Sequence, residues 1–358
     1  MVRILHVYPQ INCGGTEMVF YNLIKFGDRE HFQYELLTQR RGDNEPAFTA
    51  LGVHIYTVAK TSEKEYYHSL IVFFKREHFD VVHAHMDKDL PLVLKAAAKA
   101  GVPCRVAHSH NARVDIPKLL WPLFYFHHRP YQRYATHLFG CSALALRWLF
   151  PGKAKQGYVI HNGIDLDKFR FNPTTRQRLR KEFDIDDTTS IFINVGRCTE
   201  QKNQKFILSL ARERAQQNEL YVIIGEGPLS GELSKQKNDE GLDNVVLPGK
   251  RADVEEWLCA ADVFLFPSVY EGLGIVAVEA EASGLKVLAS NTIPPEADMG
   301  LGNYHSVSLN NIAKWHQLMS QPCYDNFRRA ELSENARSSE YNIRTVTHQV
   351  EDIYSKSC

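Results

Sequence analysis

The chain has 358 residues, a length at which two domains of roughly 150 residues each are expected. Lysine plus arginine number 42, and aspartate plus glutamate also number 42, so the formal net charge is zero. This balance argues against a general nucleic-acid-binding protein, which usually carries a clear basic excess. The contents of 44% hydrophobic and 23% charged residues are ordinary for a globular protein and exclude wholesale disorder.

Short β-rich runs alternate with longer helical patterns, which is typical of parallel α/β folds. In the first half of the chain, strands are expected at residues 4–8, 34–38, 53–57, 81–84, 105–108, 138–141 and 158–161. Helices are expected there at residues 17–26, 67–77, 89–100 and 118–135. In the second half, strands are expected at 191–195, 220–224, 245–247, 263–266, 287–289 and 304–307, and helices at 204–217, 252–260, 275–282 and 311–320.

The boundary between the two predicted domains falls near residues 162–185, which contain a turn and then a charged helical segment. We assign residues 1–165 to an N-terminal domain and residues 166–339 to a C-terminal domain, with a helix at about 340–358 packing back on the first. Ligands of doubly wound folds bind outside the carboxyl ends of the strands. A cleft between the domains is therefore the expected site.

The positive charge is concentrated in the N-terminal domain. Residues 1–165 hold 20 Lys and Arg against 14 Asp and Glu, together with 13 of the 16 histidines. A basic domain could face an anionic membrane or an anionic substrate. Drift of composition between two domains explains the asymmetry equally well.

The seven cysteines are scattered and include no C-x-x-C pair, so they indicate neither a disulfide framework nor a zinc site. A reducing compartment fits them best. The apolar start before Pro9 is too short for a signal peptide. The densest apolar run, at 119–126, is far shorter than the roughly 20 residues that span a bilayer. We expect a cytoplasmic protein, at most peripheral on the inner face of the plasma membrane.

Gly14 and Gly15 follow the first strand and open the first helix. Glycines there let a phosphate approach the N–H groups of a helix N-terminus, where the dipole favours negative charge. The fingerprint G-x-G-x-x-G is absent, which weakens a nicotinamide interpretation. Taken alone, the pair is explained more readily by a plain turn.

His108 and His110 stand where the fifth strand is expected to end. Imidazoles there can donate to sugar or phosphate oxygens. A metal is less expected, because no Asp, Glu or Cys stands beside the two histidines. His83 and His85 repeat the spacing after another strand, so such histidines are, taken alone, more often structural.

Arg197 and Lys202 lie in the loop after the first strand of the second domain. Arginine can fork onto two phosphate oxygens and lysine supplies a point charge, so this pair could neutralise a diphosphate. The loops at 225–228 and 249–254, which carry Gly225, Gly227 and Arg251, either lie against a base or ribose or are ordinary turns.

Residues 267–280 are the most informative stretch. A strand ends in Pro-Ser, and a glycine-rich loop with Glu271 leads into a helix with Glu279. Eight helical residues advance roughly 12 Å, so the two carboxylates suit opposite ends of an extended ligand. The backbone amides between them, which belong to Gly272, Leu273, Gly274 and Ile275, suit a phosphate.

These motifs together resemble the retaining family 4 glycosyltransferases of the GT-B fold. The E-x7-E pattern of Glu271 and Glu279 matches the hallmark of this family, and the other motifs follow in the family's order. They are Gly14-Gly15, Asn162-Gly163-Ile164-Asp165, Gly196-Arg197 with Lys202-Asn203, and Gly225-x-Gly227. His108-Ser109-His110-Asn111, Cys141-Ser142 with Trp148-Leu149-Phe150, and Ser290-Asn291-Thr292-Ile293-Pro294 resemble enzymes of bacterial capsule and exopolysaccharide assembly. Leu285-Lys286 departs from the family, which more often has a small residue or proline there.

The resemblance implies two Rossmann-like domains that face each other across a cleft. It implies transfer of a hexose or N-acetylhexosamine from a nucleotide diphosphate sugar, expected to be a UDP-sugar, to a glycan that is expected to be lipid-linked. Retention of the anomeric configuration is implied as well. No metal or other cofactor is expected, because cations and helix dipoles replace Mg²⁺.

The same resemblance implies a role for each candidate residue. The diphosphate would lie against Arg197, Lys202 and the amides of residues 272–275, and Gly15 would close over it. Glu279 would take the ribose hydroxyls and Glu271 the hydroxyls of the donor sugar. His108 or His110 would lie near the anomeric carbon, and the sequence does not choose between them.

Other interpretations stay open. A nucleotide-sugar epimerase or a phosphorylase could share the fold, and a non-catalytic partner subunit could bind a nucleotide sugar. An NAD-dependent oxidoreductase fits the α/β pattern but lacks the glycine fingerprint. The aromatic and basic segment 119–129 suits either a membrane interface or a core helix.

Overall fold

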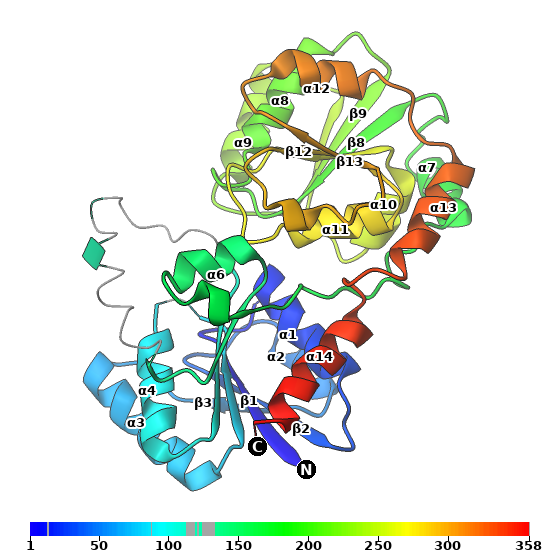
Figure 1. Ribbon diagram of the computed structural model, residues 1–358. Coiled ribbons are helices and arrows are strands. Elements are labelled where there is room, and N and C mark those ends of the chain that lie inside the picture. Colours follow the sequence, from blue (N-terminus) through cyan, green and yellow to red (C-terminus); the bar gives the residue numbers. More distant parts are fainter. Residues whose placement is uncertain (13, 87, 112–118, 120–121, 124–132, 358) are drawn as a thin grey trace. The chain divides into compact units, whose positions relative to one another are not determined.

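The computed structural model describes residues 1–12, 14–86, 88–111, 119, 122–123 and 133–357. The chain forms two compact units, one of Met1–Ile164 with Glu340–Cys358 and one of Asp165–Ser339. Both are parallel α/β units, as the alternating pattern predicts (Figure 1). The expected helix at 118–135 and the aromatic segment 119–129 fall largely outside the described residues.

The N-terminal unit is built on a seven-stranded sheet in the order β3-β2-β1-β4-β5-β6-β7. Its strands are β1 (Val2–Val7), β2 (Phe32–Thr38), β3 (His54–Thr57), β4 (Val81–Ala84), β5 (Cys104–Ser109), β6 (His137–Gly140) and β7 (Tyr158–Val159). Its described helices are α1 (Gly15–Phe26), α2 (Glu45–Ala50), α3 (Glu63–Glu77), α4 (Leu90–Ala100), α6 (Ala143–Leu149), η3 (Ala154–Gln156) and α14 (Ile343–Ser355).

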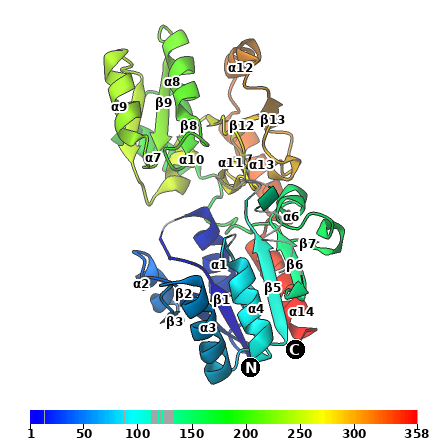
Figure 2. The same ribbon diagram turned by 90° about the vertical axis from the view of Figure 1, so that its left-hand side faces the viewer.

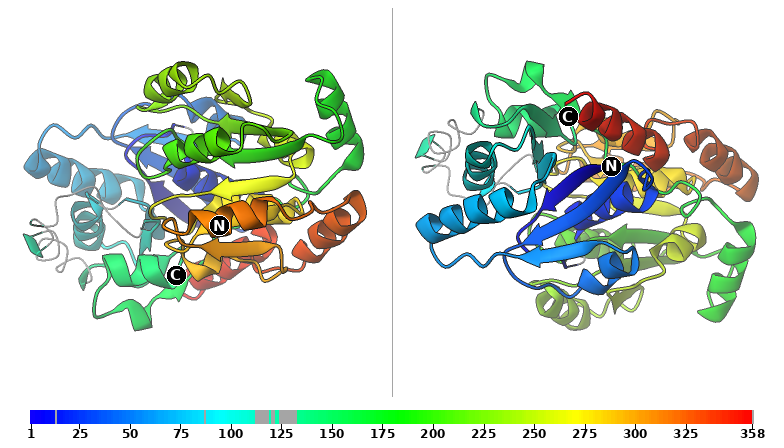
Figure 3. Two further views of the ribbon diagram at one scale, coloured as in Figure 1. Left: turned by 90° about the horizontal axis from the view of Figure 1, so that it is seen from above. Right: turned by 90° about the horizontal axis from the view of Figure 1, so that it is seen from below.

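Successive residues of β1 point to opposite faces of this sheet. Leu5 and Val7 lie in a buried core with side chains of α3 and α4, whereas His6 stacks on Phe20 of α1. α14 packs against α1 on that second face, although the two helices are far apart in the sequence. It ends close to where β1 begins, and the views agree on this (Figure 1, Figure 2 and Figure 3).

The C-terminal unit is built on a six-stranded sheet in the order β10-β9-β8-β11-β12-β13. Its strands are β8 (Ser190–Val195), β9 (Glu219–Ile224), β10 (Val245–Gly249), β11 (Val263–Phe266), β12 (Lys286–Ser290) and β13 (Tyr304–Val307). Its helices are α7 (Pro173–Glu182), α8 (Gln204–Glu213), α9 (Ser230–Asp239), α10 (Val254–Ala260), α11 (Ile275–Ala282), η4 (Pro295–Ala297), α12 (Ile312–Met319) and α13 (Asn326–Ala336).

β11, a central strand of this second sheet, is apolar along its whole length because helices cover both faces. All four residues of β11 are fully buried. Side chains of α8, α9 and α12 form one core with β8, β9 and β11, in which Trp315 is fully buried. This rigid base supports the loops that leave the carboxyl ends of β8 and β11.

In the part of the chain that the structure describes, no helix combines the length and the apolar character that crossing a membrane requires. The described cysteines are free thiols: Cys104, Cys141, Cys198, Cys259 and Cys323.

Glu281 of α11 is a buried carboxyl whose titration affects stability. Its oxygens accept the N–H of Met299 at 3.1 and 3.3 Å, but burial raises its pKa to about 9. The folded protein therefore holds a proton that the unfolded chain releases above its ordinary pKa of 4.5. The contribution of this group to the stability of the folded protein is complete below pH 4.5 and is lost as the pH rises toward 9.

We expect Glu281→Gln to remove this loss, because glutamine keeps the shape and the acceptor but cannot ionise. Between pH 5 and pH 8, the melting temperature of the wild type should fall relative to that of the variant by roughly 5–10 °C. Thermal unfolding of the intact protein at both pH values measures the difference. Parallel behaviour of the two proteins would contradict it.

Candidate active site

The order of the second sheet reverses between β8 and β11, which is where ligands of doubly wound folds bind. The loop after β8 carries Lys202, and the loop after β11 carries Glu271. Lys202 Nζ lies 2.7 Å from Glu271 Oε1, and the two side chains are 18% and 9% exposed. Two of the predicted site residues, which are 69 positions apart, thus meet in a largely water-excluded ion pair at the switch point.

Several hydrogen bonds tie these two loops together. The backbone N–H of Val269 donates to Gln201 O at 2.8 Å, and Gln201 Nε2 donates to Tyr270 O at 3.0 Å. Asn203 Nδ2 donates to Pro267 O at 3.1 Å. The loops therefore position Lys202 and Glu271 as one unit.

Gly225 and Gly227 let the loop after β9 approach the loop after β8. Gly225 has φ +136°, and a side chain there would overlap the carbonyl oxygen of Gly196. A side chain at Gly227 would overlap the backbone of Cys198. The structure thus gives both glycines a packing role. Their contact with the nucleotide-sugar donor stays a prediction.

Helix α11 begins at Ile275 after Gly274, whose φ is +93° and which provides no side-chain cap. The first N–H groups of the helix consequently have no capping side chain, which suits an anion. Glu279, further along α11, is half-buried. Burial raises its pKa to about 8, and the positive charge of Lys168 partly offsets this rise. Its carboxyl is thus mostly protonated at neutral pH in this state.

The two predicted arginines differ. Arg251 forms a two-pronged ion pair with Asp253, at 2.8 and 2.6 Å. Arg197 is exposed, and within the described residues its guanidinium has no ion-pair partner. Two surface hollows of the protein lie elsewhere, one between β3 and α3 and one beside α7 and α10. Neither is lined by Lys202 or Glu271.

In the N-terminal unit, Gly14 and Gly15 have different surroundings. A side chain at Gly14 would overlap the carboxyl of Glu17, which folds back and accepts the N–H of Asn12 at 3.3 Å. Burial raises the pKa of this Glu17 carboxyl. Around Gly15, no described atom outside its chain neighbours and its own helix backbone lies within 4 Å of the place where a side chain would begin. Of these two glycines, Gly15 is therefore the one that leaves room for a ligand.

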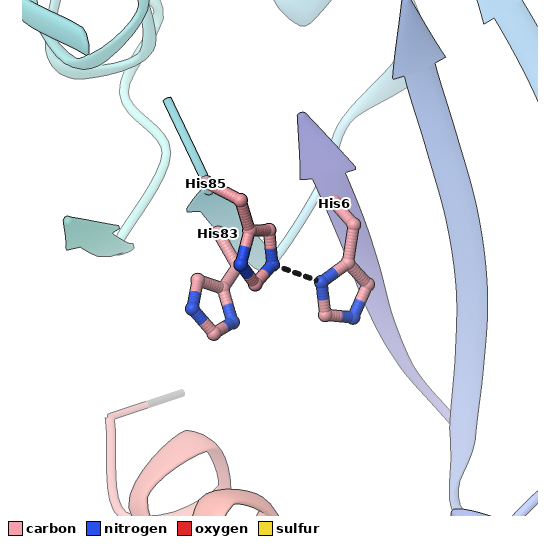
Figure 4. A group of neighbouring side chains, drawn as sticks. All are labelled: His6, His83 and His85. Carbon is pink, nitrogen blue, oxygen red and sulfur yellow. Dashed lines mark hydrogen bonds between the residues drawn. The ribbon is translucent and has the colours of Figure 1, made fainter. Parts of the chain in front are cut away.

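His108 and His110 lie at the end of β5 in a group of five buried histidines. The other three are His6 of β1, His83 of β4, and His85, which directly follows β4. Figure 4 shows His6, His83 and His85 with their rings close together and the bond between His6 Nδ1 and His85 Nε2, which is 2.8 Å long. The sequence reveals the repeated H-x-H spacing, but the contact between the two pairs depends on strand order.

The hydrogen bonds form two strings. In the first, Tyr354 Oη lies 2.5 Å from His83 Nδ1, and His83 Nε2 lies 3.0 Å from His108 Nδ1. In the second, the bond from His6 to His85 continues through His85 Nδ1 to His110 Nε2 at 2.9 Å.

All five histidines are neutral at physiological pH. Burial lowers the pKa of His6 and of His110 to about 3. Burial and the neighbouring rings hold the pKa of His83, His85 and His108 well below the ordinary value. Neutral imidazoles can donate or accept hydrogen bonds but carry no charge to a diphosphate.

Two groups of three of these histidines have nitrogens close enough together to hold a metal ion: His6, His83 and His85, and His85, His108 and His110. In both groups, nitrogens already face one another in hydrogen bonds, which a metal would have to displace. Independence from metals stays a prediction.

Two parallel α/β units in series, with a cation and a carboxylate at the switch point of the second, define the class of GT-B glycosyltransferases. Solved structures share this fold. HepE from Anabaena matches with a TM-score of 0.81 and 18% identity, over 99% of this chain and 100% of that one. The glycosyltransferase WaaG matches with a TM-score of 0.72 and 18% identity, over 98% of this chain and 99% of that one.

Relatives in sequence identify the family. A putative glycosyltransferase of Bacillus subtilis, EpsF, is 32% identical over 89% of this chain and 87% of its own length. The capsular polysaccharide biosynthesis glycosyltransferase CapH of Staphylococcus aureus is 25% identical over 99% of both chains. The model for Glycosyltransferase Family 4 matches residues 13–168, and the model for Glycosyl transferases group 1 matches residues 175–339. This chain belongs to the family 4 glycosyltransferases, which confirms the predicted family and fold class.

Proposed function

We propose that this glycosyltransferase moves a hexose or N-acetylhexosamine from a UDP-sugar to a lipid-linked glycan, with retention, in the assembly of a bacterial exopolysaccharide or capsule. The observation that carries the proposal is the ion pair of Lys202 with Glu271 at the switch point. A relative from Escherichia coli, 27% identical over 81% of this chain, is named a UDP-Gal:α-D-GlcNAc-diphosphoundecaprenol α-1,3-galactosyltransferase. HepE has been solved with UDP-glucose.

The arrangement supports a division of labour within the C-terminal unit. A carboxylate close to a diphosphate is repelled unless a cation lies between them, and Lys202 supplies that cation next to Glu271. Glu271 could then accept hydrogen bonds from hydroxyls of the donor sugar through its second oxygen, which has a long contact with Gln201 Nε2 at 3.5 Å. Exposed Arg197 and the uncapped amides of α11 would hold the diphosphate, and Glu279 would accept the ribose hydroxyls.

The leaving diphosphate would be stabilised by these cations and amides without a divalent metal. The acceptor would then add on the face from which the diphosphate leaves. The basic excess of residues 1–165 is the basis for expecting peripheral contact with an anionic membrane.

A screen of UDP-sugars and GDP-sugars, by thermal shift and by release of the nucleotide, tests the proposal. We expect one UDP-sugar to raise the melting temperature and to be slowly hydrolysed, with no loss in EDTA. The anomeric configuration of the transferred sugar, read by NMR, tests retention. If no nucleotide sugar shifts the melting temperature, the proposed transfer is wrong and a partner-subunit role gains support.

The variant Gly15→Ala tests whether Gly15 contacts the ligand, because this substitution should affect ligand binding without disturbing the packing of the protein. Alanine at this first position of α1 meets no described atom outside its chain neighbours and its own helix, and it favours the helix, so the melting temperature should stay equal or rise slightly. If the phosphates approach Gly15, kcat/KM should fall about tenfold or more. The matched control is Gly231→Ala in α9, which is also open. Unchanged kcat/KM in Gly15→Ala would remove Gly15 from the site.

A further inference from the structure

The five buried histidines share one face of the sheet and follow its register. His6 and His83 are direct partners across β1 and β4. Each bond between two histidines instead joins one histidine to another that lies two residues further along the neighbouring strand: His6 to His85, His83 to His108, and His85 to His110. Both strings therefore run from the interior of the sheet toward its carboxyl edge.

Each string has a sealed inner end and an outer end at the edge. The inner ends are the Tyr354 hydroxyl and His6 Nε2, on side chains that are fully buried. The outer ends are His108 Nε2 and His110 Nδ1. Among the described residues, His6 Nε2 and both outer nitrogens have no hydrogen-bond partner.

A neutral imidazole carries one N–H and one lone pair, so all the protons of a string must point in the same direction. Either direction leaves one unpaired N–H or O–H, at the inner end or at the outer end. A buried N–H without a partner costs about 1–3 kcal/mol, so the proton belongs at the end that a ligand or water can reach. The outer end lies nearer to solvent: His108 Nε2 and His110 Nδ1 are themselves covered in this state, but they lie at the carboxyl edge of the sheet, where His110 is 9% exposed and the neighbouring Asn111 is exposed.

The direction then fixes both tautomers. In the first string, the Tyr354 hydroxyl donates to His83 Nδ1, and His83 Nε2–H donates to His108 Nδ1. In the second, His6 Nδ1–H donates to His85 Nε2, and His85 Nδ1–H donates to His110 Nε2. The pKa of Tyr354 is held well above its ordinary value by burial, which keeps the phenol protonated as this direction requires.

We propose that the two strings fix His108 as its Nε2–H tautomer and His110 as its Nδ1–H tautomer, so that both present neutral N–H donors to an oxygen of the nucleotide sugar. His6, His83, His85 and Tyr354 are then positioning residues. This inference rests on the proposed function. It also means that neither His108 nor His110 has a free lone pair with which to accept the proton of the acceptor hydroxyl.

The test is NMR of the intact protein labelled with ¹⁵N in histidine, using two-bond proton–nitrogen correlations that distinguish the two tautomers. We expect His108 as Nε2–H and His110 as Nδ1–H, with signals assigned by single substitutions. Adding the UDP-sugar found in the screen should shift the outer N–H signals. A proton on Nδ1 of His108 or on Nε2 of His110, a charged ring, or a metal-bound ring would overturn the proposal.

His85→Phe breaks the second string while the first serves as an internal control. His110 should then populate both tautomers, His108 should stay unchanged, and kcat/KM should fall about tenfold or more. His85→Gln offers an amide N–H to His110 and should restore part of the activity. A loss of activity without a change of the His110 tautomer would show a merely structural role.

The two proposals can fail separately. The tautomers of His108 and His110 are measured without any sugar. If the protein bound no nucleotide sugar, the proposed function would be refuted, and the NMR spectra would still show which tautomers are present. Turnover of a UDP-sugar by a protein with the opposite tautomers would refute this inference alone.

Discussion

Lys202→Ala is expected to lower kcat/KM for the sugar donor about 100-fold or more. Two effects contribute. The leaving diphosphate loses a positioned cation, and removal of one such group from a preorganised site costs roughly 10²–10³ in rate. The carboxylate of Glu271, which is only 9% exposed, also loses its partner at 2.7 Å and is left to repel the diphosphate.

Steady-state kinetics with the UDP-sugar found in the screen measure this effect. Lys205→Ala is the matched control, because Lys205 lies in the same α8 region and pairs with Glu200 and Glu232 at the surface. It should change kcat/KM less than twofold. In the double variant Lys202→Ala with Glu271→Gln, the loss should be smaller than the product of the two single losses, since the variants remove a shared interaction. Wild-type kcat/KM in Lys202→Ala would show that the diphosphate lies elsewhere.

Gly225→Ala is expected to destabilise the protein by about 3 kcal/mol or more. The residue has φ +136°, a conformation that alanine rarely adopts, and the new side chain would overlap the Gly196 carbonyl oxygen. The melting temperature should fall by roughly 6–12 °C. Because the displaced segment leads into the loop that carries Arg197 and Lys202, activity should also fall at temperatures where the variant is folded.

Gly231→Ala again provides the control, since alanine there meets no described atom outside its chain neighbours and its own helix and should leave the melting temperature within a degree or two of wild type. Thermal unfolding of the three proteins gives the comparison. A Gly225→Ala protein as stable as wild type would show that the loops after β8 and β9 can separate at little cost.

The strands were the most predictable part of the fold, because buried parallel strands are short apolar runs between polar loops. The predictions for β4, β11 and β13 are correct to the residue, and every other predicted strand overlaps the observed one. Helices with a weak apolar pattern were missed. α9 and α13 are largely polar, and α2 and α6 have only six and seven residues. The start of α3 was placed four residues late, although Ser62 caps it by accepting the N–H of Glu65.

For the site, residue types and spacing indicated Lys202, Glu271, His108 and His110, but not their partners. The ion pair of Lys202 with Glu271 requires β8 to lie beside β11, and this order becomes known only when the sheet is assembled. His6 and Tyr354 carried no signal of their own. A lone histidine in a strand and a tyrosine in an amphipathic helix are ordinary core residues until the register of three strands brings them together.

The N-terminal unit is made from both ends of the chain. Ile164 pairs with Asn342 where the two connections between the units run side by side, and α14 then supplies Tyr354 to the first histidine string. During synthesis, this unit lacks one of its helices until α14 has left the ribosome, whereas the C-terminal unit is contiguous and complete earlier. The second half of the protein can therefore finish folding before the first. A chain that stopped before α14 would lose Tyr354, which is the inner end of the first histidine string.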